Sequence, residues 1–446
     1  MKLNLRSAIV VPTVLATVAA ASPAFATEAR VRSMGGGVKL WTIEDESNIF
    51  DFPSLLTRWG NRVYVDGITA EGTDSVPNGH FGFHYNLSDE TVLAFFGAHI
   101  KSADLADNPN PQQVGFVGTG NPFTGGPLGN GSRGPFIGVD NIAALAGGGP
   151  GTSVEYRWGL MFATQLGATA RFGLSFNLAG EDGDVDSPNN VQSDTGALLF
   201  DIGLGFGFDL SGSELELSAG LSIGMIDSAR DNISGTNVDL EEDWSGSHFG
   251  LRLGGRWTFD FFDQTKIVAY TQFLLASESL DQVSNPAVPA PNRSYNGLTF
   301  ALGADLRIEP FQGVIVSPGL GFYVGQQTLE NEGRVIKDAN LVVGLPFYGV
   351  AVDLKLADWV ALRFGAQQFV DMYRTSDTAD GQTNTFTNTD VTTTFAWGLG
   401  FNIPVAESAL AIDLAMNPTF FNNGPHVLSG TATGQFALNA ALRYSW

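Results

Sequence analysis

Arginine and aspartate side chains recur at every fourth position in residues 248–261, HFGLRLGGRWTFDF. Arg252, Arg256 and Asp260 share one set of alternate positions, and the positions between them hold only apolar residues and glycine. Guanidinium and carboxylate groups on one face pair with each other, bind charged solutes or set the ionic selectivity of a water-filled channel. The stretch therefore predicts a charged face that is backed by an apolar one.

The same alternation continues along most of the chain and assigns more charged residues to this face. Five arginines of the set, at positions 171, 256, 307, 363 and 443, lie towards the short connections between segments. Two arrangements are open: the arginines form a ring that contacts acidic residues 44–46, or the charges pair across neighbouring strands. The candidate channel-lining residues are Arg157, Arg171, Asp201, Arg252, Arg256, Asp260, Asp305, Arg307, Arg363, Asp371 and Arg443.

Residue types suited to catalysis or transition-metal binding lack a supporting spacing. The chain has five histidines and no cysteine. His80 and His84 are four residues apart, which is about 13 Å on a strand and too far to share one metal ion. No local motif marks a set of serine, histidine and acid. We therefore expect a protein that is not an enzyme and that has no resident cofactor.

Two acidic tracts, residues 180–190 and 231–243, are the candidates for a bound cation. Calcium takes carboxylate and carbonyl oxygens as ligands, and in these tracts it could also bridge to lipopolysaccharide. Neither tract has the spacing of an EF-hand, so loop-bound calcium competes with the simpler interpretation of solvated loops.

The element that positions the charged face is a β-strand with the length of a membrane crossing. Successive side chains of a strand point to opposite faces, and a tilted transmembrane strand needs about 9 to 11 residues. The predicted fold is an all-β, transmembrane, antiparallel up-and-down β-barrel of about sixteen strands, or fourteen if two of the weaker segments are divided wrongly. The sixteen segments are 61–70, 79–87, 91–100, 153–166, 168–181, 196–210, 213–228, 248–261, 265–279, 297–310, 313–327, 340–356, 360–374, 392–404, 410–421 and 435–446.

The predicted connections alternate between long and short. Bacterial single-chain barrels have short periplasmic turns and longer outer loops, which places both chain ends on the periplasmic side. Loop 101–152 is the longest, and it either folds over the pore mouth or extends into solvent. The long connections are 71–78, 101–152, 182–195, 229–247, 280–296, 328–339, 375–391 and 422–434, and the short ones include 211–212, 311–312 and 357–359.

The N-terminus and the composition predict the location. Lys2 and Arg6 precede a short apolar stretch, and Ala24-Phe25-Ala26 is typical of a cleavage site, so we expect a secretory signal over residues 1–26. A secreted membrane barrel belongs in the outer membrane of a bacterial cell. The formal net charge of −23 argues against nucleic acid as a partner, because phosphate binding needs a basic surface.

The C-terminus ends on an aromatic residue of an alternating segment. Tyr444 and Trp446 share the apolar face of residues 435–446. This ending resembles the C-terminal recognition signal of outer-membrane barrels, although that signal usually ends in phenylalanine. The resemblance implies that the barrel-assembly machinery is a partner of this chain.

The segment before the barrel, residues 27–60, does not alternate. It contains an Arg-x-x-x-Met-Gly-Gly stretch at residues 30–36 and an Asp-x-Ser-x-Ile-aromatic run at residues 45–50. These motifs resemble the N-terminal hatch of the fatty-acid transporter-like outer-membrane family and its PorV-type relatives. The sequence departs from the family at Phe52 and Ser54, where the family has asparagine and alanine. The candidate hatch residues are Met34, Gly35, Gly36, Asp45, Ser47, Ile49, Phe50 and Pro53.

The resemblance implies a plugged barrel that acts as a passive transporter of small molecules. In that family the transported molecules are hydrophobic and the barrels have fourteen strands. Lateral exit of the solute through the wall is a hypothesis that comes with the resemblance. Two alternatives stay open: an open general diffusion porin, and a structural barrel that docks secretion or surface proteins. Expected partners are outer-membrane lipid and lipopolysaccharide, the assembly machinery and a small-molecule solute. The expected domains are the signal (1–26), the hatch or plug (27–60) and the barrel (61–446).

Overall fold

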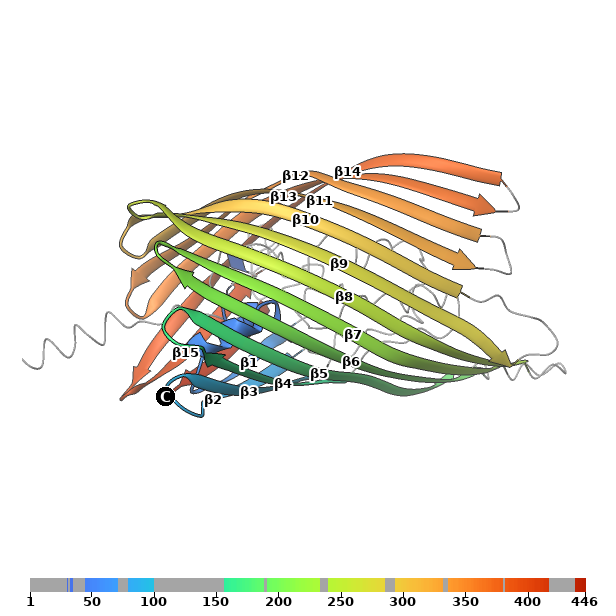
Figure 1. Cartoon of the computed structure of the whole chain (residues 1–446), viewed down its shortest axis with the longest axis horizontal. Coiled ribbons are helices and arrows are strands. Elements are labelled where there is room, and N and C mark those ends of the chain that lie inside the picture. The colour runs from blue at the N-terminus through green and yellow to red at the C-terminus, as the bar shows by residue number, and fades with distance from the viewer. Residues whose placement is uncertain are drawn as a thin grey trace, which may run out of the picture.

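The computed structural model describes residues 30, 33–34, 45–70, 79–99, 156–187, 191–232, 240–284, 293–331, 336–379, 382–416 and 438–446. Sixteen strands form one closed antiparallel barrel in which every strand pairs with its neighbours in sequence and β1 pairs with β16. Figure 1 shows the strands crossing the barrel at a common tilt. The predicted fold class and the count of sixteen are thus confirmed, and the alternative of fourteen is wrong. The strands are β1 (Arg62–Ala70), β2 (Gly79–Asn86), β3 (Thr91–His99), β4 (Tyr156–Gln165), β5 (Ala170–Ser187), β6 (Val191–Leu210), β7 (Ser213–Asn232), β8 (Leu240–Phe262), β9 (Thr265–Ser284), β10 (Arg293–Phe311), β11 (Val314–Asn331), β12 (Ile336–Ala357), β13 (Val360–Ala379), β14 (Gln382–Val405), β15 (Ser408–Met416) and β16 (Leu438–Ser445).

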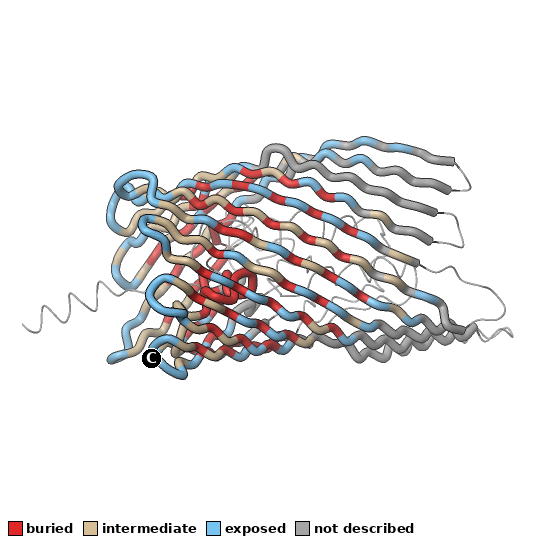
Figure 2. The backbone as a smooth tube through the Cα atoms, in the orientation of Figure 1, coloured by how far each residue is buried: buried red, intermediate tan, exposed pale blue. Residues whose placement is uncertain are grey.

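The two faces of β8 are sorted as the alternation predicts. Phe249 and Trp257 are 41% and 48% exposed on the outside, whereas Arg252 and Arg256 are 2% and 4% exposed on the inside. Figure 2 shows the same alternation of exposed and buried residues along neighbouring strands. An apolar outer face and a polar inner face are the arrangement of a barrel whose outside meets lipid. Among the described residues, no helix is long and apolar enough to cross a membrane.

Five of the predicted long connections are instead mostly strand. Their described residues lengthen the strands β5 to β14, and Gly183, for example, pairs with Thr195. The five connections are 182–195, 229–247, 280–296, 328–339 and 375–391. These residues are polar and do not alternate, so hydropathy does not reveal them. A hydrogen-bonded ladder between two strands can continue beyond the apolar region because it is made by the backbone.

The acidic tracts considered for calcium are part of these extensions. Residues 180–187 lie in β5, residues 231–232 in β7 and residues 240–243 in β8. Extended strands spread their side chains over two faces instead of turning them around one ion. Among the described residues, no group of three or more histidine, cysteine or acidic side chains could hold a metal ion. The signal 1–26 and loop 101–152 lie outside the described residues, as do 71–78 and 422–434.

The barrel closes where the two ends of the chain meet. β1 and β16 pair from Arg62 and Ser445 onward, and the backbone N–H of Trp446 donates a hydrogen bond of 3.1 Å to the carbonyl oxygen of Asn61. The indole of Trp446 stacks on Phe83 of β2 with 6.0 Å between ring centroids, and on Tyr444 at 6.1 Å. The last residue therefore covers the outside of the seam at the short-turn end.

Replacing Trp446 with alanine should slow barrel assembly, whereas replacing it with phenylalanine should preserve it. Each aromatic pair lost at the seam removes about 1 kcal/mol. The measurement is the rate at which the heat-modifiable folded band forms on a gel after dilution into lipid vesicles. Equal rates for the alanine variant and the unchanged protein would show that the terminal ring has no part in closure.

Candidate lumenal site

Two short 3-10 helices lie inside the barrel, near its short turns. They are η1 (Glu46–Phe50) and η2 (Pro53–Arg58), and Figure 1 shows them within the ring of strands. Pro53 occupies the first turn of η2, where its fixed φ suits the helix and its missing N–H is not needed. We call residues 45–60 the inner segment. Its position in the lumen determines which inward-facing side chains of the wall it contacts and which remain available to a solute.

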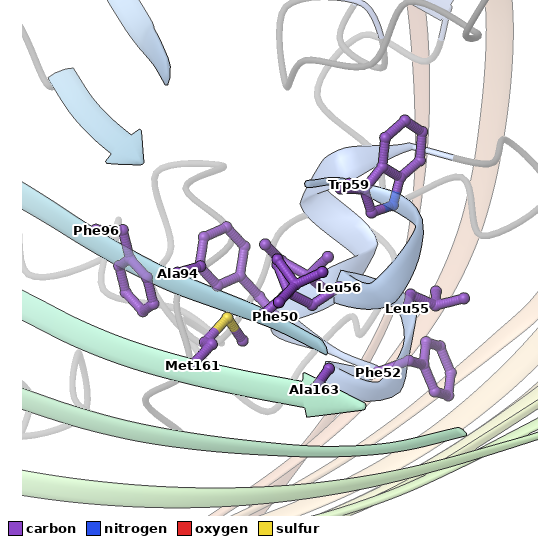
Figure 3. Close-up of a cluster of buried hydrophobic side chains, with 11 residues drawn as sticks. Phe50, Phe52, Leu55, Leu56, Trp59, Ala94, Phe96, Met161 and Ala163 are labelled. Carbon is purple, nitrogen blue, oxygen red and sulfur yellow. The ribbon is translucent and has the colours of Figure 1, made fainter. Parts of the chain in front are cut away.

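The inner segment packs against an apolar part of the lumenal wall formed by β3 and β4. Phe50 meets the ring of Phe96 edge-on, with 4.9 Å between centroids and 82° between planes (Figure 3). Phe95 and Phe96 interrupt the predicted alternation because Phe95 faces outward, at 40% exposure, and Phe96 faces this core at 5%. The buried core consists of Ile49, Phe50, Phe52, Leu55, Leu56, Trp59, Val92, Ala94, Phe96, Met161 and Ala163.

Replacing Phe50 with alanine should loosen the inner segment without unfolding the barrel. Truncating a buried phenylalanine costs about 3 to 5 kcal/mol, and here that cost falls on the contact between segment and wall. We expect faster cleavage within residues 45–60 by proteinase K while the strands stay resistant. Phe81→Ala is the control, since Phe81 is an outward-facing residue with 40% exposure. Equal cleavage of the two variants would contradict the expectation.

Glycines in the wall allow the backbone of the N-terminal region to lie directly on the strands. A Cβ at Gly173 of β5 would lie 2.2 Å from the carbonyl carbon of Pro53. On β13, a Cβ at Gly365 would overlap the carbonyl oxygen of Met34. β5 and β13 are eight strands apart in the ring of sixteen, so they stand on opposite sides of the lumen. The described residues between Arg30 and Trp59 thus contact both sides of the barrel interior.

A first group of ion pairs attaches η2 to β5, β6 and β7. The hydroxyl of Ser54 donates to Oε2 of Glu216 at 2.5 Å, and Arg58 lies 2.6 Å from Glu214. Arg171 also holds this group together, with contacts of 2.6 Å to Asp209, 3.0 Å to Glu214 and 2.6 Å to Glu216. Buried carboxylates need such partners, because an uncompensated charge in a water-poor interior is costly.

A second group surrounds Glu46 of η1. Arg62 of β1 lies 3.4 Å and Arg443 of β16 lies 3.8 Å from its Oε2, and Nδ1 of His84 lies 3.4 Å from its Oε1. The same Nδ1 is 2.7 Å from the carbonyl oxygen of Trp59. β1, β2 and β16 are therefore linked to Glu46 near the start of the inner segment, and His84 of β2 also contacts its end at Trp59.

A third group holds Arg30 against the opposite wall. Its guanidinium lies 2.8 Å from Asp353 of β12, and Asp353 is also 3.4 Å from Nε of Arg363. Arg363 donates in addition to Asp413 of β15.

Two further arginines, both on β8, contact the residues between η1 and η2. Nη1 of Arg252 lies 3.7 Å from Asp51, and the guanidinium of Arg256 lies over the ring of Phe52 at 5.9 Å. Phe52 and Ser54, the two departures from the family motif, thus both have specific contacts in this protein.

The structure combines the two arrangements considered for the arginine ring. Arg443 approaches Glu46 of the inner segment, whereas Arg171 and Arg363 pair with carboxylates of the wall. Each of these two arginines contacts the adjacent strand, at Asp209 or Asp353, and the strand two positions away in the ring, at Glu216 or Asp413. Asp201 and Asp305 are buried on the inner face, and Arg307 lies on the same face of β10. Asp260 lies at the short-turn end, where it pairs with Lys266 at 3.4 Å. The side chains of Arg157 and Asp371 lie outside the described residues, although their backbones belong to β4 and β13.

Most of the candidate hatch residues lie in or next to the inner segment. Met34, Asp45, Ile49, Phe50 and Pro53 are all buried. Gly35, Gly36 and the side chain of Ser47 lie outside the described residues.

The sequence analysis missed Arg58, Arg62 and His84, which hold the inner segment, and the interior role of Phe96 and Met161. The break at Phe95-Phe96 was the only signal that could have located the apolar wall.

A closed barrel with an apolar outer face and a charged lumen defines the class of outer-membrane β-barrels. No family model and no curated protein matches the sequence. Among solved structures, the chain is similar to the toluene transporter TodX of Pseudomonas putida, with 9% identity over 94% of this chain and 98% of that chain and a TM-score of 0.39. It is also similar to the toluene transporter TbuX of Ralstonia pickettii, with 10% identity over 94% of this chain and 97% of that chain and a TM-score of 0.39. The ferric-catecholate import receptor Fiu of E. coli K12 has 10% identity over 86% of this chain and 81% of that chain, with a TM-score of 0.35. Similarities at this level carry no argument about the solute.

Proposed function

We propose that this protein is a passive outer-membrane transporter for small molecules and that its N-terminal region, residues 27–60, acts as a plug. One observation carries the proposal: described residues of this region contact opposite sides of the lumen, at Gly173 of β5 and at Gly365 of β13. A general diffusion porin needs no such crossing segment. The plug must shift or be displaced before a solute can pass.

Assignment to the fatty-acid transporter-like family is part of this proposal and rests on the motifs of residues 30–53. In that family the solutes are hydrophobic. The apolar wall of β3 and β4, which the inner segment covers, supports contact with an apolar solute once the segment moves. The inward-facing residues of β5 to β8 beside the segment are polar, and they support a polar solute instead. Outer-membrane lipid, lipopolysaccharide and the assembly machinery are proposed partners, because the exposed outer face and the aromatic C-terminus fit them.

Single-channel conductance in a planar bilayer tests the proposal. The refolded protein that begins at Thr27 is compared with a version that lacks residues 27–56. We expect the first to be silent and the second to conduct. Equal conduction by both proteins would favour the open porin. Silence of both proteins, together with co-purification of a secreted or surface protein, would favour the docking barrel.

A further inference from the structure

A row of buried polar side chains lies on the inner face of β5 to β8, just beyond the inner segment. Asn177 pairs across the ladder with Asp201, and Asp201 pairs with Ser222. Nε2 of His248 lies 3.2 Å from the hydroxyl oxygen of Ser222, and Arg252 follows four residues later on the same inward face of β8. We call these five residues the polar row. All are at most 3% exposed.

The position of the polar row follows from the course of β8. Arg256 is beside Phe52 and Arg252 is near Asp51, so the inner segment lies at the level of these two arginines. His248 precedes them and is farther from the short turn after β8. The polar row therefore borders the inner segment on the side of the long connections, where a solute from the cell exterior would arrive.

Two acceptor atoms of the polar row are left without a hydrogen bond. The amide nitrogen of Asn177 donates to Oδ1 of Asp201 at 2.9 Å. Within the described part of the chain, Oδ2 of Asp201 and Oδ1 of Asn177 are buried and have no hydrogen-bond partner. Both atoms accept hydrogen bonds, and burying them without a donor costs free energy. Together they fit a donor group such as an ammonium or a hydroxyl.

Arg252 of the same polar row offers hydrogen-bond donors instead of acceptors. Its Nη1 faces Asp51 at 3.7 Å, while Nε and Nη2 are buried and have no hydrogen-bond partner among the described residues. Nε and Nη2 form one edge of the guanidinium, the geometry that binds a carboxylate through two parallel hydrogen bonds. Gly220, the cross-strand neighbour of Arg252, keeps this edge open, because a Cβ there would lie 3.3 Å from both nitrogens and 3.6 Å from Cζ.

We propose that the polar row binds a small zwitterion, with a carboxylate on the Nε and Nη2 edge of Arg252 and an ammonium at Asp201 and Asn177. The inference deepens the proposed function, on which it rests, by naming the class of solute as amino-acid-like. A simple anion would leave the acceptors of Asp201 and Asn177 unsatisfied, and a simple cation would leave the guanidinium edge unsatisfied. A ligand with both groups supplies a donor for the two acceptors and an acceptor for the guanidinium edge.

The test is titration calorimetry on the refolded full chain in detergent with three matched probes. L-alanine carries both charged groups, propionate lacks the amine, and ethylamine lacks the carboxylate. We expect saturable binding of L-alanine, and binding of each fragment that is weaker by roughly tenfold to hundredfold, since a hydrogen bond to a charged group contributes that much. Binding of L-alanine that is absent, or no tighter than that of either fragment, would overturn the proposal.

Three variants assign the two halves of the site. Arg252→Lys removes the planar edge but keeps the charge, and Gly220→Ala places a methyl beside that edge. Both should weaken L-alanine and propionate and leave ethylamine unchanged. Asp201→Asn should weaken L-alanine and ethylamine and leave propionate unchanged. Asp260→Asn is the control, because Asp260 lies at the short-turn end and is exposed. Variants that all bind L-alanine like the unchanged protein would also overturn the proposal.

Calorimetry separates this inference from the proposed function. Binding of a zwitterion needs no passage through the barrel, whereas the plug is tested by conductance. A protein that conducts after removal of residues 27–56 but binds no L-alanine keeps the plug and loses the zwitterion site. A protein that binds L-alanine at the polar row but conducts equally with and without residues 27–56 keeps the site and loses the plug.

Discussion

A valine at position 173 is expected to turn a silent barrel into a conducting one. Gly173 lies under the inner segment, and a Cβ at this position would be 2.2 Å from the carbonyl carbon of Pro53 and 2.3 Å from the backbone nitrogen of Ser54. Both are backbone atoms and cannot turn away as a flexible side chain would. The inner segment must therefore leave the wall, while valine itself suits a strand.

Displacement of the segment would also break its other contacts to this side of the barrel. The bond from Ser54 to Glu216 would be lost, and Leu55 and Leu56, which are at most 1% exposed, would be uncovered at a cost of about 1.5 to 3 kcal/mol each. We expect single-channel openings in Gly173→Val that approach those of the protein without residues 27–56.

The control for this experiment is Ala170→Val in the same strand. Ala170 belongs to the outward-facing set of β5, so the two added methyl groups point to the outside of the barrel instead of the inner segment. This variant should be as silent as the unchanged protein. If Gly173→Val is also silent although proteinase K now cleaves its inner segment, displacement of the segment does not open the lumen, and the plug is refuted.

The second large effect is expected from Arg363→Met, which should destabilise the barrel by about 3 to 5 kcal/mol. Arg363 and Asp413 are both fully buried, at 0% exposure. The guanidinium passes over Gly400 of β14, where any Cβ would overlap it, and so reaches Asp413 on β15. Without Arg363, Asp413 is a buried charge that has lost this cation, and Asp353 loses one of its two arginines.

The measurement is the free energy of unfolding in urea from lipid vesicles. Arg363→Met combined with Asp413→Leu should recover most of the loss, because a buried ion pair exchanged for apolar residues is often tolerated. Lys266→Met is the matched control: Lys266 and Asp260 are 52% and 60% exposed, and breaking such a pair costs at most about 1 kcal/mol. A loss for Arg363→Met as small as that of Lys266→Met would show that Asp413 does not depend on its arginine.

The transmembrane part of the fold could be predicted from the sequence because lipid and lumen impose opposite demands on alternate residues. The first segments, 61–70, 79–87 and 91–100, match β1, β2 and β3 to within one residue at each end. The outer ends of β5 to β14 could not be predicted, since their residues do not alternate in polarity while the backbone ladder continues through them.

The candidate site was harder to predict, because it depends on which strands face each other across the lumen. Alternation places Arg171, Arg252 and Arg443 on the inner face, but it contains no information about the distance to Glu216, Asp51 or Glu46. Those contacts follow from closure of the ring and from the course of the inner segment. The apolar wall was missed for a related reason: Phe96 and Met161 face inward where the pattern predicts polar residues, because the inner segment replaces water there.

The pairing of β1 with β16 has a consequence for biogenesis. Arg62 of β1 pairs with Ser445 of β16, so the ring cannot close until β16 is in place. Until then β1 and the newest strand both present unpaired edges, which are templates for aggregation. Pairing over such a large sequence separation is slow to form, so these two edges are the last part of the barrel to be satisfied. A chain truncated by even one strand would keep both edges open and is expected to be degraded.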